Sequence, residues 1–219
     1  FISVKTEIKD GKSKGLKIVD IIVQEKPTGE ISAGAGYGSS GSTFSIGIKE
    51  NNFNGKGIKL DANISVTEES LRGKFADTNP NFAYSDRSLE TSIESTATDK
   101  EKDFGFKTSL NKIAIGTAFE QYDNIYFAPR ISMAHEALTT TANASQNYKK
   151  QEGTYFDTLF NYSLTYDKRN SPYRPTKGAI STLVQEIPLV SDGYSILNGY
   201  QIKGYNEIMD DSVLSVGLY

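Results

Sequence analysis

Apolar and polar residues alternate along several stretches of this chain, and this pattern constrains the fold more than any other feature. Residues 58–67 are apolar at every even position and polar at every odd position. Residues 43–49, 156–166 and 194–202 follow the same rule with few exceptions. A period of two is typical of a β-strand that lies between an apolar and a polar environment. The sequence therefore predicts an all-β fold.

Turn signals separate these stretches. They are rich in Gly, Asn, Asp, Ser and Pro and include Ser39–Gly41, 51–57, 79–81, 99–103, 122–124, 169–178, 191–193 and 210–211. Residues 142–153 are polar and without pattern, so we expect a long loop there. Two places resist a simple strand. Leu110 and Ile113 differ in parity, which predicts a bulge or turn at Asn111–Lys112, and Pro129 interrupts an otherwise good strand.

Two architectures give many alternating strands joined by turns: a transmembrane β-barrel and a soluble β-sandwich. Three details favour the barrel. The strands are long, Tyr and Phe concentrate near strand ends, and the polar face carries charged and amide groups at mid-strand, such as Asp61, Asn63 and Asn161. A water-filled lumen suits such groups better than a dry core does.

Composition excludes several other classes. The 219 residues contain 51 charged ones, and no stretch approaches the ~18 apolar residues of a spanning helix. There is no cysteine, hence no disulfide framework. The net charge of −3 gives no basic footprint for nucleic acid.

Signals for catalysis are equally poor. His135 is the only histidine, so neither a multi-histidine metal site nor a Ser/His/Asp set can be assembled. We therefore expect no enzyme activity, no cofactor and no metal.

The first 28 residues differ from the rest. A turn at residues 10–15 separates two strands, and the second strand, 18–23, is nearly all apolar, as if buried on both faces. Residues 27–29 (Pro-Thr-Gly) then suggest a domain boundary. The chain starts at Phe1 without Met and stops at Tyr219 within an apolar alternation, so we expect a window cut from a longer protein.

Four segments resemble one family in order along the chain. Residues 19–29 (VDIIVQEKPTG) are similar to the last strand and exit of a POTRA domain, and 34–38 (GAGYG) to the first strand of a barrel. Residues 52–57 (NFNGKG) with 77–82 (DTNPNF), and then 166–178 (YDKRNSPYRPTKG), are similar to its turns. Together they resemble the bacterial surface antigen family, whose members join POTRA domains to an outer-membrane barrel.

The resemblance implies a fold and a location. Residues 1–28 would be the terminal hairpin of the last POTRA domain, in the periplasm. Residues 29–219 would be about eleven antiparallel strands of a sixteen-stranded barrel in the bacterial outer membrane. It also implies an assembly factor that folds and inserts other barrel proteins. Its partners would be the lipid bilayer, nascent β-barrel clients, accessory lipoproteins and periplasmic chaperones.

The resemblance also points to residues. In assembly factors of the family the first barrel strand meets the last at a seam that opens laterally, and a free edge can template an incoming strand. This assigns client pairing to Glu30, Ile31, Ser32, Ala33, Gly34, Ala35, Gly36, Tyr37 and Gly38. Glycines in a strand either admit a close neighbour or weaken its packing, and both readings stay open here. We expect a structural role, with an ion pair within the last turn, for nine turn residues: Asn52, Gly55, Gly57, Asn79, Pro80, Asp167, Arg169, Pro175 and Gly178.

Other functions remain open from the sequence alone. A secretion pore of the same superfamily, which passes an unfolded polypeptide through its lumen, would share these local motifs. A plain porin or a soluble sandwich would lack the POTRA-like exit before the first barrel strand.

Overall fold

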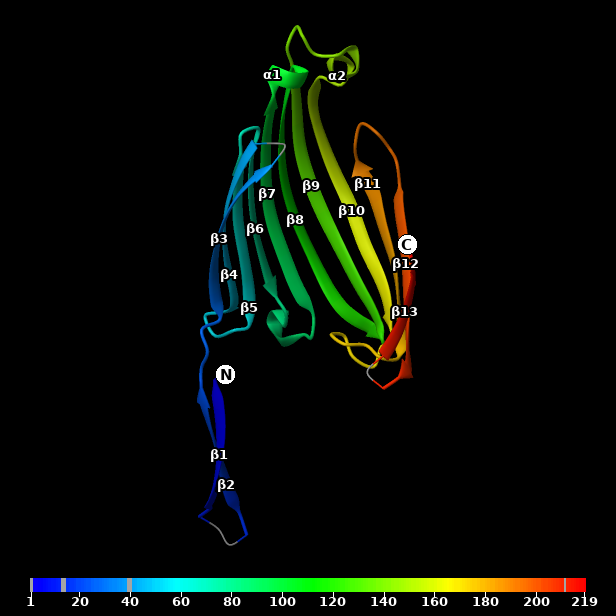
Figure 1. Cartoon of the computed structure of the whole chain (residues 1–219). Coiled ribbons are helices and arrows are strands. Elements are labelled where there is room, and N and C mark those ends of the chain that lie inside the picture. The colour runs from blue at the N-terminus through cyan, green and yellow to red at the C-terminus, as the bar shows by residue number, and fades with distance from the viewer. Residues whose placement is uncertain (1, 13–14, 39–40, 211) are drawn as a thin grey trace.

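The structure is a computed structural model that describes residues 2–12, 15–38, 41–210 and 212–219. Nearly all of it is β-strand (Figure 1). The strands are β1 (Ser3–Asp10), β2 (Lys17–Gln24), β3 (Gly29–Gly38), β4 (Gly41–Phe53), β5 (Ile58–Thr67), β6 (Ser70–Asn79), β7 (Ser88–Lys100), β8 (Phe106–Tyr122), β9 (Ile125–Thr140), β10 (Gly153–Asp167), β11 (Gly178–Val190), β12 (Leu197–Met209) and β13 (Ser212–Leu218). The helical pieces are short: η1 (Phe82–Tyr84), α1 (Glu101–Phe104) and α2 (Gln146–Lys150).

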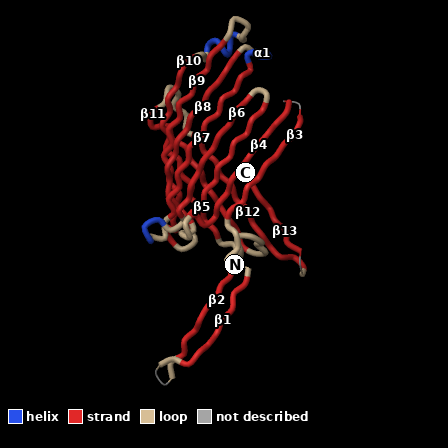
Figure 2. The backbone as a smooth tube through the Cα atoms, turned by 90° about the vertical axis from the view of Figure 1, so that its left-hand side faces the viewer, coloured by secondary structure: helices blue, strands red, loops and turns tan. Residues whose placement is uncertain are grey.

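Strands β3 to β13 form one antiparallel sheet in sequence order, with β3 at one edge and β13 at the other. The sheet curls into an open, barrel-like wall (Figures 1 and 2). This confirms the predicted fold class, a partial antiparallel barrel that is not closed within this chain. Turns alternate between the two ends of the wall. The β1–β2 hairpin extends from one end of the wall, and we call that end the hairpin end.

The alternation in the sequence sorts the side chains onto two faces of this wall. In strand order, Phe75, Ile93, Ile113 and Met133 are register partners in one row, and all are more than 40% exposed. The next row on the other face is Lys74, Glu94, Lys112 and Ala134. We call these the apolar face and the polar face. Such a division suits a wall with hydrocarbon outside and water inside.

Strand β8 corrects one prediction. It runs without a break from Phe106 to Tyr122, so the bulge or turn expected at Asn111–Lys112 is wrong. Leu110 instead lies on the polar face opposite Glu136, near the buried Leu138 of the same face. The prediction from odd and even positions failed because the polar face accepts apolar side chains where neighbouring side chains cover them.

Pro129 lies inside β9 and is paired with Tyr162 of β10. On the other side, the β8–β9 register runs from Gly116↔Arg130 directly to Phe119↔Phe127. The gap falls where Pro129 has no N–H to give to a ladder. The strand therefore tolerates this proline by leaving one short stretch unpaired.

Two further predictions are revised. The loop expected at 142–153 contains α2, whose N-cap Ser145 accepts a hydrogen bond from the N–H of Tyr148. Strand β12 begins at Leu197, so Tyr194 and Ile196 precede it. The predicted turns at Ser39–Gly41 and 210–211 include Ser39, Ser40 and Asp211, which lie outside the described residues.

The β1–β2 hairpin forms a separate two-stranded sheet. Its register gathers Val4, Ile8, Val19, Ile21 and Val23 on one face, while Lys5, Glu7, Lys9 and Asp20 lie on the other with Ile18 and Ile22. Ile18, Val19, Ile21, Ile22 and Val23 are all more than 40% exposed. The expectation that 18–23 is buried on both faces is therefore wrong for this chain by itself. Only one face is predominantly apolar.

Within the described part of the chain, no helix has the length and apolar character needed to cross a membrane. The same residues contain no group of three or more His, Cys, Asp or Glu side chains placed to hold a metal ion.

Candidate strand-pairing edge and its supporting turns

All nine residues expected to pair with a client, 30–38, lie within the edge strand β3. This strand is paired with β4 from Gly29↔Glu50 to Gly38↔Gly41. Among the described residues, no strand pairs with it on the other side. Every residue of β3 is exposed. The strand thus offers a row of free backbone donors and acceptors, the feature that permits β-augmentation.

Among the described residues, Gly34 of β3 has a close neighbour, whereas Gly36 and Gly38 have none. A Cβ at Gly34 would approach the Ser45 hydroxyl at 3.0 Å, but at Gly36 and Gly38 it would meet no described atom within 4 Å. Of the two readings left open by the sequence, weak packing therefore fits Gly36 and Gly38. Each such residue lacks a side chain to hold the strand and costs more entropy to order.

The two ends of β3 are held differently. At the hairpin end, both the backbone N–H and the side-chain amide of Asn51 donate to the Thr28 carbonyl, at 3.2 and 3.1 Å. Toward the other end, the apolar face carries Ala33, Ala35 and the fully projecting Tyr37, which is 86% exposed. The strand is thus anchored where it enters the sheet and loosely packed toward Gly38.

The turn after β4 contains three of the predicted structural residues. The Asn52 side-chain oxygen accepts a hydrogen bond from the Gly57 N–H at 2.7 Å, which closes the turn. Gly55 and Gly57 have φ of 70° and 69°, so both glycines adopt the positive φ expected from the sequence. Asn54 shares this conformation, with φ of 56°.

Asn79 and Pro80 begin the next turn at the same end. The Asn79 side chain accepts a hydrogen bond from the Asn81 N–H at 3.2 Å. A Cβ on Gly57 would lie 3.9 Å from the ring of Pro80, so this turn and the preceding one are neighbours. These two predicted turn motifs come together, whereas the third lies further along the sheet.

The third turn, between β10 and β11, is built on an ion pair. The Arg169 guanidinium donates two hydrogen bonds to the Asp167 carboxylate, at 2.9 and 2.6 Å, and a third to the Pro172 carbonyl at 3.3 Å. Both side chains are about one-fifth exposed. The hydrogen bond to Asp167 raises the pKa of Arg169 above its usual range. The expected internal ion pair is therefore present.

Gly178 closes that turn and leaves no room for a side chain. Its φ is 97°, and a Cβ would come within 2.0 Å of the Lys168 carbonyl oxygen. The Lys168 N–H also donates to the Ala179 carbonyl at 2.8 Å. Pro175 lies in the same loop. Among the hydrogen bonds of the described residues, none involves Pro175, so none explains its position.

At the opposite end, the loops after β7 and β9 interlock. The Thr141 N–H donates to the carbonyl of Gly105 at 2.8 Å, and Ala144 beside it is only 6% exposed. The Glu152 carboxylate accepts hydrogen bonds from the hydroxyl and N–H of Thr140, and these lower the pKa of Glu152. We call this arrangement the loop cap.

The structure also shows a polar network that the sequence reasoning did not assign. On the polar face, the Arg130 guanidinium donates to the Ser92 hydroxyl at 2.6 Å and lies 3.9 Å from Glu90. Next to it, Asn161 donates to Glu186 and accepts from Ser132, which is 2% exposed. The alternation of apolar and polar residues could have indicated this network, because its members occupy polar-face positions of successive strands.

The comparisons with known proteins decide the family. A family model described as the Omp85 superfamily domain matches residues 52–216. The chain belongs to the Omp85 superfamily. This confirms the predicted membership of the POTRA-barrel proteins.

A curated relative is the outer membrane protein assembly factor BamA of Nitratidesulfovibrio vulgaris, which is 25% identical over 221 residues. The match covers 98% of this chain and 27% of the relative. A solved structure, BamA from Haemophilus ducreyi lacking POTRA domains 1–3, superposes with a TM-score of 0.70 at 23% identity. It covers 98% of this chain and 45% of that one, so this Omp85 chain spans under half the length of either relative.

Proposed function

We propose that this Omp85 chain is the beginning of the barrel of an outer-membrane protein assembly factor, which folds and inserts β-barrel clients. The relative from N. vulgaris carries that name. The single observation that carries the proposal is the composition of β3, the first strand of the sheet, where a Cβ at Gly36 or Gly38 would meet no described atom within 4 Å.

The mechanism follows from backbone chemistry. An unpaired N–H or C=O in hydrocarbon costs several kcal/mol, by a rough general estimate. A client strand that enters the bilayer beside β3 exchanges these unmet groups for a ladder of hydrogen bonds. Because Gly36 and Gly38 contribute no side chain to the pairing of β3, this strand separates easily from a neighbour in the closed barrel. Residues Glu30 to Gly38 act through their backbone, and no covalent step is involved.

The two sheets support a division into two domains. In this proposal residues 1–28 are the last hairpin of a POTRA domain, in the periplasm, and residues 29–219 are barrel. The apolar face of the hairpin, with Val4, Ile8, Val19, Ile21 and Val23, needs covering by the rest of such a domain. The bilayer, nascent clients, accessory lipoproteins and periplasmic chaperones are the proposed partners.

The test is disulfide crosslinking in the full-length protein. Ser32→Cys or Ala35→Cys, paired with a cysteine in the last strand of a nascent client, should give a crosslink during assembly. Ser45→Cys is the matched control, because β4 is paired with β3 and β5 on its two sides. If β3 gives no more crosslink than Ser45→Cys while assembly proceeds, strand templating is refuted.

The polar face favours one alternative enough to test it. Glu90, Glu94, Lys112, Arg130 and Asp157 line the side that would face the lumen, as a polypeptide-secretion pore requires. Planar-bilayer conductance that is blocked by an unfolded secretion substrate would support the pore. Client crosslinking at β3 without such blockade would support the assembly factor.

A further inference from the structure

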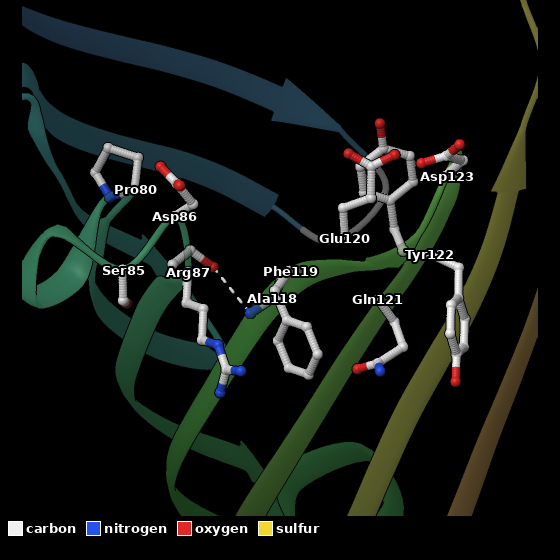
Figure 3. A pocket seen from close by; sticks show the side chains of 12 residues that line it. Pro80, Ser85, Asp86, Arg87, Ala118, Phe119, Glu120, Gln121, Tyr122 and Asp123 are labelled. Carbon is white, nitrogen blue, oxygen red and sulfur yellow. Dashed lines mark hydrogen bonds between the residues drawn. The ribbon is translucent and has the colours of Figure 1, made fainter.

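A recess of about 810 Å³ opens at the hairpin end, away from β3. It lies between the loop that follows β6 (residues 80–87) and the β8–β9 hairpin (Figure 3). In the sheet, β4 to β7 separate it from β3. The proposed function above makes no use of this place.

One wall of the recess is a free strand edge. Strand β7 begins at Ser88, which is paired with Ala118, but β8 continues to Tyr122. Residues 119–122 therefore have a partner strand on the β9 side, and among the described residues none on the β7 side. The Ser88 hydroxyl accepts the Ala118 N–H at 3.0 Å and closes the β7–β8 ladder there. Beyond this point the backbone of β8 is open to an added strand.

The facing loop does not fill that edge, because its own hydrogen bonds are internal. The Phe82 N–H donates to the Arg87 carbonyl at 2.8 Å, and the Ser85 hydroxyl donates to the Phe82 carbonyl at 2.6 Å. Ala83, Tyr84 and Asp86 all have φ near 55°, an unfavourable conformation for such residues. Strain of this kind persists only when the surroundings impose it, and it concentrates at functional sites. Here the internal hydrogen bonds hold the loop in this conformation, folded on itself beside the recess.

The charges around the recess indicate what would fit. Asp86, Glu120 and Asp123 contribute three carboxylates, while Arg87 is the single cation among the lining residues. The guanidinium of Arg87 lies over the Phe119 ring, 4.5 Å from its centroid. Along β8, Glu120 lies on the same face as Ala118, and Phe119 lies on the other face. A strand inserted here would meet carboxylates on one side and an aromatic ring on the other.

We propose that this recess captures an extended polypeptide segment that alternates basic and apolar residues, which adds to β8 as a short antiparallel or parallel strand. Backbone hydrogen bonds to those groups of residues 119–122 that face away from β9 would hold the segment. Its basic side chains would meet Asp86, Glu120 and Asp123, and its apolar side chains would lie on the Phe119 face, beside the Arg87 guanidinium that covers the ring. The recess is thus a second strand-binding place, at the opening of the wall and separate from the β3 edge.

The test uses the full-length protein in lipid nanodiscs and a fluorescent hexapeptide probe that alternates lysine and valine. Anisotropy should show saturable binding. A probe N-methylated on alternate residues keeps its charge but cannot complete a ladder, so it should bind at least about fivefold more weakly. The double variant E120Q/D123N should weaken the unmodified probe about threefold to tenfold at low salt. Glu120→Gln keeps a side-chain oxygen to accept the Asn124 N–H, a hydrogen bond of 2.6 Å that supports the hairpin.

Position is tested by photo-crosslinking from benzoylphenylalanine at Gln121, with Tyr173 as the matched control. Tyr173 is at the same end, 94% exposed, and outside the recess. Capture at Gln121 above the Tyr173 level supports the proposal. It is overturned if the unmodified probe does not bind, if methylated and unmodified probes bind equally, or if both positions crosslink equally. Crosslinking of a client at β3 is measured separately, so failure here is distinguishable from failure at β3.

Discussion

The edge strand β3 and the wall formed by β8, β9 and β10 belong to one sheet but are built in opposite ways. Strand β3 has 10 residues, all exposed, whereas β8, β9 and β10 have 17, 16 and 15 and are each paired on both sides. The wall contains buried side chains such as Ala114, Ser132 and Leu138, and the Arg130 network crosses it. Among the described residues β3 is paired on one side only, so the two regions differ in backbone pairing as well as in side-chain packing.

The difference teaches where an Omp85 wall concentrates its stability. Long strands, closed turns and the loop cap fix β7 to β11 as a rigid support. The β3 edge has its anchor at Thr28 and Asn51 and little beyond it. In the proposed function, such a sheet opens at the β3 edge while the other strands keep their arrangement. The following predictions break or sharpen that contrast, from the largest expected effect to the smallest.

Gly178→Ala should be the most damaging single change to the wall. The new Cβ would collide with the Lys168 carbonyl, and alanine disfavours a φ of 97°. We expect a loss of roughly 2–4 kcal/mol in unfolding free energy, measured by urea unfolding of the full-length barrel with heat-modifiable gel mobility as readout. Gly204→Ala in β12 is the control, since a Cβ there meets no described atom within 4 Å. Equal effects of the two changes would refute the role of Gly178.

Arg169→Ala should weaken the same turn by a smaller amount. It removes three hydrogen bonds and leaves the half-buried Asp167 carboxylate without its partner. Charge-assisted hydrogen bonds at partly buried sites contribute about 1–3 kcal/mol. The same unfolding assay measures it, and Lys177→Ala is the control, because Lys177 is 67% exposed and 3.8 Å from Glu207. A loss no larger than that of the control would contradict the account.

The double change G36V/G38V should act in the other direction, on the β3 edge. Valine favours strands and fills open space, so we expect pairing of β3 to gain about 0.5–1 kcal/mol per position. Client assembly should slow, because the edge releases its neighbour less readily. Gly73→Val in β6 is the control, since that glycine also has open space but lies away from the edge. Unchanged assembly rates in G36V/G38V, with folding intact, would argue against a role for loose packing.

The smallest expected effect is a pH dependence of the loop cap. Because hydrogen bonds from Thr140 lower the pKa of Glu152 in the folded protein, its contribution is present above the ordinary value of 4.5 and is lost as pH falls through the lowered pKa. As pH falls below 4.5 and through the lowered pKa, the cap should become more susceptible to an acid-active protease such as pepsin. Glu152→Gln should remove this dependence. Cleavage that stays constant with pH would contradict the interpretation.

Much of the fold could be predicted because alternation records which face of a strand meets water. The pattern in residues 58–67 matches β5 residue for residue, and that in 156–166 lies within β10. It failed at Leu110, because an apolar residue on the polar face of one strand depends on neighbours from other strands. It also failed at residues 18–23, where the run of apolar residues does not reveal that only one face of the hairpin is predominantly apolar.

The candidate sites show a similar limit. Glycines, Asn52 and the Asp167–Arg169 pair could be found because their requirements are local in sequence. The Arg130 network and the recess beside β8 could not, because both depend on register and on where one strand stops relative to the next. Because β7 begins at Ser88, residues 119–122 have no partner on that side among the described residues. No residue type in either segment predicts this by itself.

The central claim, that β3 is a weakly held pairing edge on a rigid wall, is tested most directly by amide hydrogen exchange of the full-length protein in lipid bilayers. The account predicts that the β3 amides from Gly34 to Gly38 exchange at least about a hundredfold faster than hydrogen-bonded amides at the centres of β8, β9 and β10. Protection of β3 equal to that of β9 would contradict it.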